Sequence, residues 1–235
     1  MLRVSVIQLP AAWGEAGPAL ALADRALAEG PPTDLALLPE MSLSGYVSPA
    51  IDFDLSRFAE PIDGPTALAL GALATKHRTH LVGPLVLEED GALFNATVGF
   101  TPQGARFLLY KKRHPWIPEE WATPGPDPHP LIALGEKKLT VACCYDVHFL
   151  AREAKSTLDA ADVLLFPSAW VEERDSRLRR LTAIARTHRI AVVAANWGPG
   201  VLHVKGQGSS AIIDASGDIV AQALPGTLRV DATIE

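Results

Sequence analysis

The sequence predicts an α/β fold built on mixed β-sheets. Short apolar runs with the length of buried strands alternate with longer segments in which apolar residues recur at helical spacing. Two turn pairs, Asp90-Gly91 and Gln103-Gly104, separate successive strand-like runs and indicate hairpins, which a purely parallel sheet would lack. With 235 residues, 48% of them hydrophobic, the chain is long and apolar enough to enclose a sizeable core. We expect one domain over residues 1–235.

The first half of the chain should interleave two amphipathic helices with apolar strands. Leu20 and Leu27 fall on one face of the first helix, and Leu68 and Ala72 fall on one face of the second. Pro39 ends the short strand between them, because proline cannot extend a ladder of hydrogen bonds. We expect strands at 2–9, 34–38, 80–87, 93–100 and 106–111, and helices at 18–28 and 65–77.

The second half begins with a proline-rich loop at 115–130 and then returns to alternating strands and helices. Leu178, Leu181 and Ala185 share one face of the last expected helix, and its arginines lie on the other faces. Ser216-Gly217 marks a hairpin turn near the C-terminus. We expect strands at 138–144, 162–166, 190–195, 210–214, 218–223 and 227–231, and helices at 150–160 and 172–188.

Composition excludes several classes of function. The 21 lysines and arginines and 27 acidic residues give a net charge of −6, which argues against a nucleic-acid-binding protein. No apolar run has the length of about 18 residues that a membrane helix needs. Residues 4–23 are interrupted by polar residues, glycine and proline, so we expect no signal peptide. The two cysteines, Cys143 and Cys144, are adjacent, which excludes a disulfide framework and agrees with a soluble, cytoplasmic protein.

Three places combine a reactive residue with the end of an expected strand. Glu40 follows an apolar strand, although on that context alone a helix cap or a solvated acid is the better interpretation. Residues 110–120 hold a cluster of basic residues, then Trp116 and acids, which can be an ordinary solvated loop or an ordered functional one. Cys143 and Cys144 end a strand that runs into a helix, where a thiol can be structural or nucleophilic. Because side chains alternate along a strand, Cys144 is the better candidate nucleophile.

Together these residues resemble the nitrilase superfamily of carbon–nitrogen hydrolases. The resemblance lies in Pro39-Glu40 with Ser44-Gly45-Tyr46, in Tyr110-x-Lys112-x-His114, in Cys144-Tyr145-Asp146, in 166–170, in Ala195-Asn196 and in 208–217. It implies a four-layer α-β-β-α sandwich of two mixed sheets with outer helices. The loop from His114 to Gly125 is similar to that of the aliphatic amidases, and this alignment picks Glu120 rather than Glu119 as a supporting glutamate.

The resemblance implies a catalytic triad of Glu40, Lys112 and Cys144. Cys144 would attack the carbonyl carbon of an amide, Glu40 would carry the proton, and Lys112 would favour the thiolate. The oxyanion would be held by Lys112 and the N–H of Tyr145. Glu120 would orient Lys112 or the substrate. Trp116 and Trp170 are expected to line an apolar pocket, or simply to pack.

No metal or organic cofactor is expected, because the histidines lack the spacing of a zinc site and no nucleotide-binding loop is present. A small-molecule amide and a second copy of the chain in a homodimer are the partners that the resemblance implies. An N-carbamoyl amino acid or ω-amide substrate is the near alternative, and a nitrile is less favoured. His148-Phe149 stands where the family often has arginine and an aromatic residue, which leaves the substrate open. Two alternative hypotheses belong to other classes of protein. One is a catalytically inert binding protein on the same scaffold, and the other is an isochorismatase-like cysteine hydrolase.

Overall fold

The computed structural model describes residues 1–14, 16–172, 176–224 and 226–235. The first sheet contains β1 (Leu2–Ile7), β2 (Leu35–Leu37), β3 (His80–Glu89), β4 (Ala92–Phe100), β5 (Arg106–Lys111) and β12 (Arg229–Ile234). The second sheet contains β6 (Ile132–Leu134), β7 (Lys137–Val141), β8 (Val163–Ser168), β9 (Ala191–Asn196), β10 (Ala211–Ile213) and β11 (Ile219–Gln222). The α-helices are α1 (Ala16–Glu29), α2 (Pro65–His77), α3 (Leu150–Glu153), α4 (Lys155–Ala160) and α5 (Ser176–His188). Two 3-10 segments complete the set, η1 (Ser56–Phe58) and η2 (Cys144–His148).

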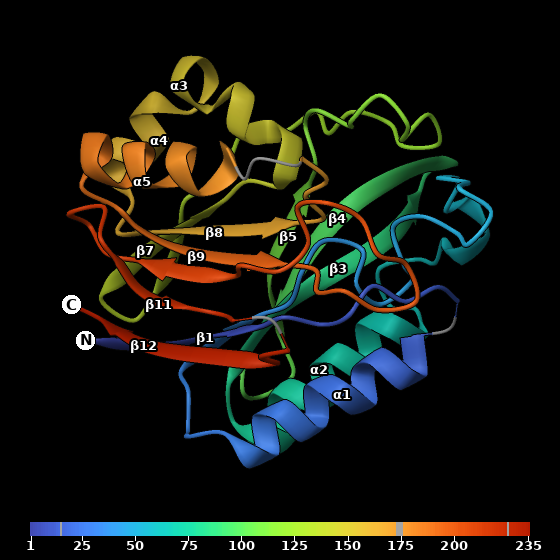
Figure 1. Cartoon of the computed structure of the whole chain (residues 1–235), viewed down its shortest axis with the longest axis horizontal. Coiled ribbons are helices and arrows are strands. Elements are labelled where there is room, and N and C mark those ends of the chain that lie inside the picture. The colour runs from blue at the N-terminus through green and yellow to red at the C-terminus, as the bar shows by residue number, and fades with distance from the viewer. Residues whose placement is uncertain (15, 173–175, 225) are drawn as a thin grey trace.

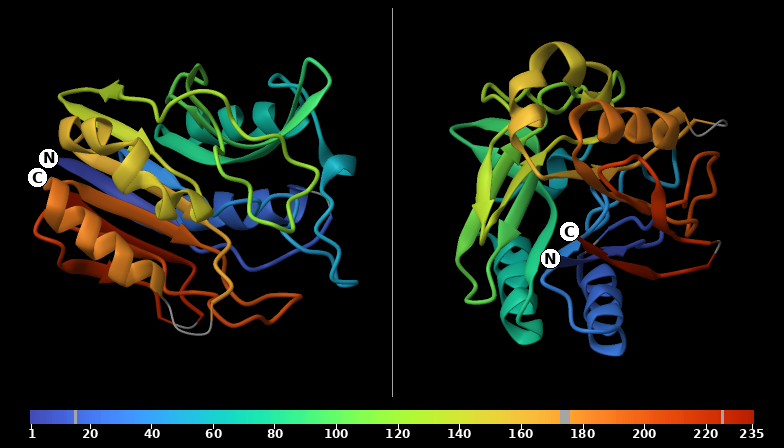
Figure 2. Two further views of the ribbon diagram at one scale, coloured as in Figure 1. Left: turned by 90° about the horizontal axis from the view of Figure 1, so that it is seen from above. Right: turned by 90° about the vertical axis from the view of Figure 1, so that its left-hand side faces the viewer.

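These elements form four layers. The two sheets lie face to face, α1 and α2 cover the outer face of the first sheet, and α3, α4 and α5 cover the outer face of the second (Figure 1). The views from above and from the side show the same order of layers (Figure 2). The predicted α-β-β-α sandwich of two mixed sheets is therefore confirmed.

Both sheets follow one plan, with three parallel strands flanked by antiparallel ones. The strand orders are β12-β1-β2-β3-β4-β5 and β11-β10-β9-β8-β7-β6, and the parallel strands are β1 to β3 and β7 to β9. Every residue of β8 and β9 is buried, as expected for parallel strands that are covered on both faces. The two ends of the chain are neighbours, because Leu2 of β1 pairs with Ile234 of β12.

Most of the predicted elements are present, but several boundaries are wrong. The strand predicted at 138–144 ends at Val141, and Cys144 begins η2. The helix predicted at 150–160 is divided at Ala154, which leaves helical geometry with φ −125° and ψ 14°. The last strand runs from Arg229 to Ile234 rather than 227–231, and the short strand β6 was not predicted. The helix predicted from 172 is described from Ser176, and residues 173–175 lie outside the described part of the chain.

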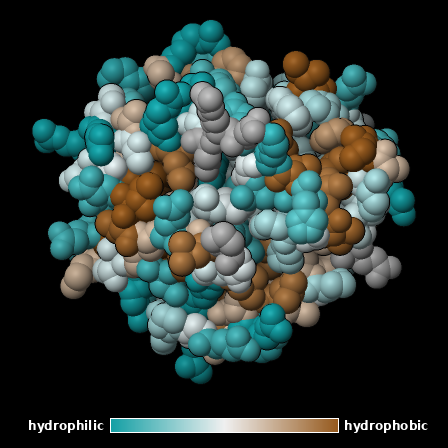
Figure 3. Space-filling model, viewed as in Figure 1, coloured by the Kyte–Doolittle hydropathy of each residue, from teal (hydrophilic) through white to brown (hydrophobic). Residues whose placement is uncertain are grey.

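Apolar side chains fill the space between the sheets and the space under the helices. One buried cluster joins the facing strands of the two sheets, and another packs α1 and α2 against the first sheet. The face of the molecule in Figure 3 is mostly hydrophilic, with separate apolar patches. Within the described residues, none of the helices combines the length and the apolar character needed to cross a bilayer.

Candidate active site

Glu40 lies three residues beyond the end of β2, on the side of its carboxyl end. All three residues of β2 are buried, and Pro39 has no N–H with which to extend the ladder. The chain then turns back, because Met41 has a φ of 50° and its carbonyl accepts from the N–H of Gly45 at 2.8 Å. The Glu40 side chain is buried, and its Oε2 accepts from the backbone N–H of Ala169 at 2.8 Å. Since Ala169 follows β8, Glu40 bridges the two sheets.

Lys112 follows the last residue of β5, and its side chain points into the same buried region. Alternation along the strand sends Lys111 the other way, where it forms an ion pair with Glu89. The Lys112 Nζ donates to Glu40 Oε1 at 2.7 Å. It also donates to both oxygens of Glu119, at 2.8 and 2.9 Å. Lys112 therefore joins two carboxylates, one from the loop after β2 and one from the loop after β5.

The charge of Lys112 is maintained by these two carboxylates. Its side chain has no solvent exposure, and burial by itself acts to lower the pKa of a lysine. The charges of Glu119 and then Glu40 outweigh burial, so the pKa of Lys112 lies well above its ordinary value. The site therefore holds an ammonium group without access to water. The two carboxylates, which are equally buried, stabilise its charge.

Asn95, in the middle of β4, contacts both carboxylates, as Lys112 does. Its Nδ2 donates to Glu40 Oε1 at 2.9 Å and to Glu119 Oε1 at 3.2 Å. Its backbone carbonyl accepts from the N–H of Lys112 at 2.8 Å. Asn95 therefore contacts every member of the Glu40–Lys112–Glu119 cluster.

Glu119, and not Glu120, is the glutamate next to Lys112, so the expectation for Glu120 is wrong. The loop makes a tight turn in which the N–H of Glu119 donates to the Trp116 carbonyl at 2.7 Å. The N–H of Trp116 in turn donates to Glu119 Oε2 at 2.9 Å, which directs that side chain inward. Glu120 comes one residue after the turn and is exposed, on the wall of a different depression beside Trp121.

Cys144 stands at the start of η2, in a turn held by the carboxylate of Asp146. Asp146 Oδ2 accepts from the N–H of Cys143 at 2.9 Å and from the hydroxyl of Tyr110 at 2.6 Å. Asp146 Oδ1 accepts from the N–H of His114 at 2.9 Å. Tyr110 and His114 lie on either side of Lys112, so one buried carboxylate connects the lysine segment to the cysteine turn. Cys144 itself has a φ of 46°, a left-handed conformation that non-glycine residues adopt only at a cost of about 1–2 kcal/mol.

The pKa values of Cys144 and Glu40 are shifted in opposite directions. Burial, followed by the charge of Glu40, raises the pKa of Cys144 well above its ordinary value, and Lys112 opposes this shift. Burial also acts to raise the pKa of Glu40, but Lys112 and side-chain hydrogen bonds from Lys112, Asn95 and Cys144 outweigh it and lower that pKa. Lys112 thus acts in the expected direction, towards the thiolate, but burial and the charge of Glu40 outweigh its effect on the pKa of Cys144 in the resting site.

A small cavity gives access to this sulfur. Its volume is about 120 Å³, and aromatic rings and small apolar groups form most of its wall. The lining residues are Tyr46, Trp116, Cys144, Tyr145, His148, Ala169, Trp170, Val171 and Glu172. The expectation that Trp116 and Trp170 border the pocket agrees with this position, and the Trp170 ring also stacks on His148 with centroids 6.1 Å apart. Both cysteines belong to the buried cluster between the sheets, but Cys143 is not among the residues that line the cavity.

The family model for carbon-nitrogen hydrolases matches residues 3–233. The chain belongs to the carbon-nitrogen hydrolase family. This confirms the resemblance to the nitrilase superfamily that the sequence motifs indicate.

Curated relatives of this carbon-nitrogen hydrolase include bacterial enzymes. A hydrolase of the pqqF 5′ region of Pseudomonas protegens is 31% identical over 172 residues, which are 72% of this chain and 59% of that protein. A formamidase of Pseudomonas syringae pv. tomato is 29% identical over 161 residues, which are 66% of this chain and 45% of that protein. The chain thus covers about half the length of these relatives.

Solved structures share the fold over the whole chain. A carbon-nitrogen hydrolase superfamily protein of Xanthomonas campestris aligns with a TM-score of 0.84 and 24% identity, covering 100% of this chain and 90% of that one. A mutant amidase of Nesterenkonia aligns with a TM-score of 0.83 and 23% identity, covering 98% of this chain and 90% of that one. At this level of identity the likeness establishes the fold alone.

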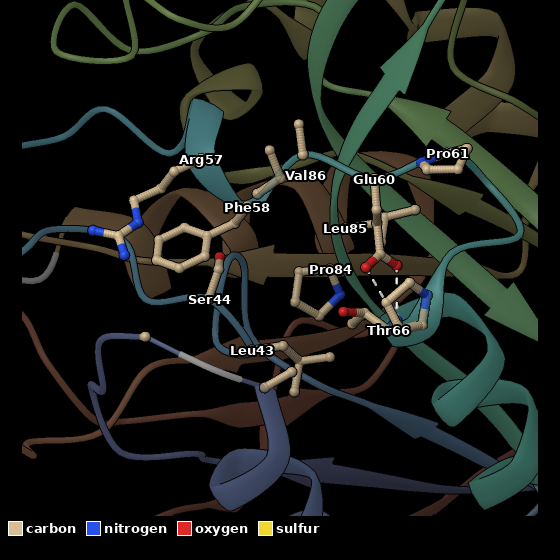
Figure 4. Close-up of a pocket in the computed structure, with 14 residues that line it drawn as sticks. Leu43, Ser44, Arg57, Phe58, Glu60, Pro61, Thr66, Pro84, Leu85 and Val86 are labelled. Atoms are coloured by element: carbon tan, nitrogen blue, oxygen red, sulfur yellow. Dashed lines mark hydrogen bonds between the residues drawn. The ribbon is translucent and has the colours of Figure 1, made fainter.

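A larger cavity, of about 380 Å³, lies behind the Glu40 loop of this carbon-nitrogen hydrolase (Figure 4). Its carboxylate, Glu60, accepts from the backbone N–H groups of Thr66 and Ala67 at 2.8 and 3.0 Å, and so caps α2. Its Ser44 hydroxyl donates to the carbonyl of Gly45 at 3.3 Å. Since the described residues of its lining include neither a thiol nor a lysine, the smaller cavity is the candidate active site although it is smaller in volume.

Sequence reasoning did not find two members of the site, Asn95 and Tyr46. The sequence does contain an indication of Asn95. An amide in the middle of an apolar strand is expected to be buried and therefore to need a hydrogen-bonding partner. Tyr46 was noted as part of a motif but given no position. It is buried beside the carboxylates, and burial followed by the charge of Glu119 raises its pKa well above the ordinary value.

Proposed function

We propose that this carbon-nitrogen hydrolase is an amidase that cleaves the C–N bond of a small linear carboxamide through a thioester on Cys144. One observation carries the proposal. The Cys144 thiol lies on the wall of a cavity, and the charges of Glu40 and Lys112, which meet at 2.7 Å, both act on it. This arrangement supports Cys144 as nucleophile, Glu40 as proton acceptor and Lys112 as the positive charge, and amide cleavage needs all three.

The first half of the reaction forms the thioester. Glu40 removes the thiol proton as the sulfur attacks the carbonyl carbon, and the electron pair of the C=O bond moves to oxygen. The raised pKa of Cys144 makes this coupling necessary, because a thiol that stays protonated is a poor nucleophile until its proton leaves. Collapse of the tetrahedral intermediate breaks the C–N bond, and Glu40 returns the proton to the departing nitrogen as ammonia or an amine.

The second half releases the acid. A water molecule gives a proton to Glu40 while its oxygen attacks the thioester carbon. The C–S bond then breaks, the carboxylic acid leaves, and the proton returns from Glu40 to the sulfur. Glu40 therefore alternates between base and acid, a role that its contact with Cys144 permits in both directions.

Lys112 would stabilise the oxyanion mainly through its charge. Its three N–H donors face Glu40 and Glu119 in the resting site, so a direct hydrogen bond to the substrate oxygen requires one of the contacts with Glu119 to open. The backbone N–H of Tyr145 is the second proposed donor. Tyr145 lies in the first turn of η2, where N–H groups lack partners within the helix.

The size of the cavity supports a short acyl group. A cavity of about 120 Å³ between aromatic side chains has room for a small amide and for little beyond it. Formamide and acetamide fit this limit, whereas a long acyl chain would have to displace Trp116 or Trp170. The formamidase and amidase among the similar proteins agree with a small amide.

Ammonia release from a substrate panel tests the proposal. The panel contains formamide, acetamide, propionamide, butyramide, an N-carbamoyl amino acid, the half-amide of a dicarboxylic acid and a short nitrile. We expect turnover of the smallest amides by the wild type and by Cys143→Ala, and none by Cys144→Ala. Thermal unfolding of all three proteins controls for folding. Turnover by Cys144→Ala would refute the assignment of Cys144 as the nucleophile. If the wild type released ammonia from none of the compounds, the result would favour an inert binding protein.

A further inference from the structure

The side chain of Asn95 has more contacts in the site than a strand residue needs for packing. It is 2% exposed and sits between Glu40 and Glu119, with its Nδ2 2.9 Å from one carboxylate and 3.2 Å from the other. The opposite placement of the amide would set its oxygen against two carboxylates, so the amide nitrogen must face them. The backbone of the same residue receives the N–H of Lys112 at 2.8 Å.

The oxygen of this amide is left without a partner. Asn95 Oδ1 is buried and has no hydrogen-bond donor within reach. A buried polar atom without a partner destabilises a fold, and an apolar side chain of similar shape would avoid that loss. Packing therefore does not explain an asparagine at this position. The two donor hydrogens of the amide, which both point at carboxylates, do explain it.

We propose that Asn95 is a positioning residue for hydrolysis: its amide bridges Glu40 and Glu119 beside the Lys112 ammonium and keeps Glu40 in place as the acceptor of the Cys144 proton. The proposal rests on the proposed function, because it assigns Asn95 to the same reaction. The distances support it. Oε1 of Glu40 is occupied by Lys112 at 2.7 Å and by Asn95 at 2.9 Å, while Oε2 is fixed by the N–H of Ala169 at 2.8 Å.

Two carboxylates around one ammonium repel each other, and the amide offsets this repulsion. The charged and titratable groups that face Glu40 are Lys112 after β5, Glu119 in the following loop, Cys143 and Cys144 at the start of η2 and, more distantly, Tyr46. Of these, Lys112 alone is a cation. Without the donors of Asn95, Glu40 has less support as an anion and accepts a proton at a higher pH. The group that should receive the thiol proton is then already protonated in slightly acidic solution.

The pH dependence of ammonia release by Asn95→Leu tests this role, and Thr97→Val is the matched control. Thr97 lies two residues further along β4, on the same face, and is equally buried. For Asn95→Leu we expect kcat to fall roughly ten- to a hundredfold, as for the loss of a hydrogen bond to a charged group, with KM changed by less than about threefold. The acid limb of kcat/KM should move to higher pH. Thr97→Val should keep the wild-type profile.

A second variant separates this role from a general effect on folding. Asn95→Asp keeps the shape of the side chain but places a third carboxylate in the cluster, so its activity at neutral pH should fall below that of Asn95→Leu. An unchanged acid limb in Asn95→Leu, or an equal loss in Thr97→Val, would overturn the proposal. These outcomes presuppose ammonia release by the wild type, whereas the proposed function fails if the wild type releases none.

Discussion

Replacing Asp146 by asparagine changes one atom of the carboxylate that joins the lysine segment to the cysteine turn. Asp146 Oδ2 accepts from Tyr110 and Cys143, and Oδ1 accepts from the N–H of His114. The asparagine can place its amide oxygen where Oδ2 of Asp146 lies, so that the hydrogen bonds from Tyr110 and Cys143 are retained. Its NH₂ group then meets the N–H of His114, so one hydrogen bond is lost, two donors are left facing each other and the remaining bonds lose their charge.

The expected loss follows from these contacts. A hydrogen bond to a charged group contributes about 1.5–3 kcal/mol, and an unsatisfied buried donor destabilises by about 1–3 kcal/mol. We therefore expect Asp146→Asn to lower the free energy of unfolding by about 3 kcal/mol. Urea denaturation measures this quantity, provided that the slope with denaturant stays that of the wild type.

Asp162 supplies the matched control. Its carboxylate also accepts from a backbone N–H, that of Lys138 at 2.7 Å, but this pair is exposed. Asp162→Asn should therefore lower the free energy of unfolding by less than about 1 kcal/mol. If Asp146→Asn loses no more than this control, the carboxylate of Asp146 does not hold the two segments together and the reasoning is refuted.

Two further variants test the electrostatics around the site. Glu119→Gln removes one of the two charges that balance the buried ammonium and should lower kcat at least about tenfold, whereas Glu120→Gln should stay within about twofold of the wild type; equal effects in kinetic assays would contradict the assignment. Arg152 and then His114 hold the pKa of Glu153 at about 2. Because this pKa lies below that of an unfolded glutamate, about 4.3, its contribution is complete above that pH and is lost as the pH falls through about 2. Glu153→Gln should thus be less stable than the wild type at pH 7, by under about 1 kcal/mol, and the difference in urea denaturation should shrink below pH 4; a constant difference would refute the linkage.

Local chemistry predicted much of the fold. Asp90 and Gly91 have φ of 53° and 78°, so the turn between β3 and β4 has the two positive angles that this residue pair favours. The alternation of apolar runs and helices likewise gave the right class, and the central runs that form β2, β8 and β9 are buried throughout. The motifs containing Glu40 and Lys112 led to side chains that meet at 2.7 Å, although 72 positions separate them.

The errors come from information that a pattern of residue types does not contain. Glu119 and Glu120 have the same side chain, and the turn closed by Trp116 decides which one faces inward. The run of small and apolar residues up to Cys144 looks like a continuous strand, but the bonds to Asp146 wind its end into η2. The role of Asn95 depends on two glutamates from distant loops, which no local spacing reveals.

The central claim is that Cys144 carries the acyl group during turnover. Mass spectrometry of the protein quenched during turnover of a slow amide, followed by fragmentation of the peptide that contains both cysteines, tests this claim most directly. We predict a mass increase equal to the acyl group, located on Cys144, and its absence from Cys144→Ala. An adduct on Cys143, or turnover without any adduct in a protein whose deacylation is rate-limiting, would contradict it.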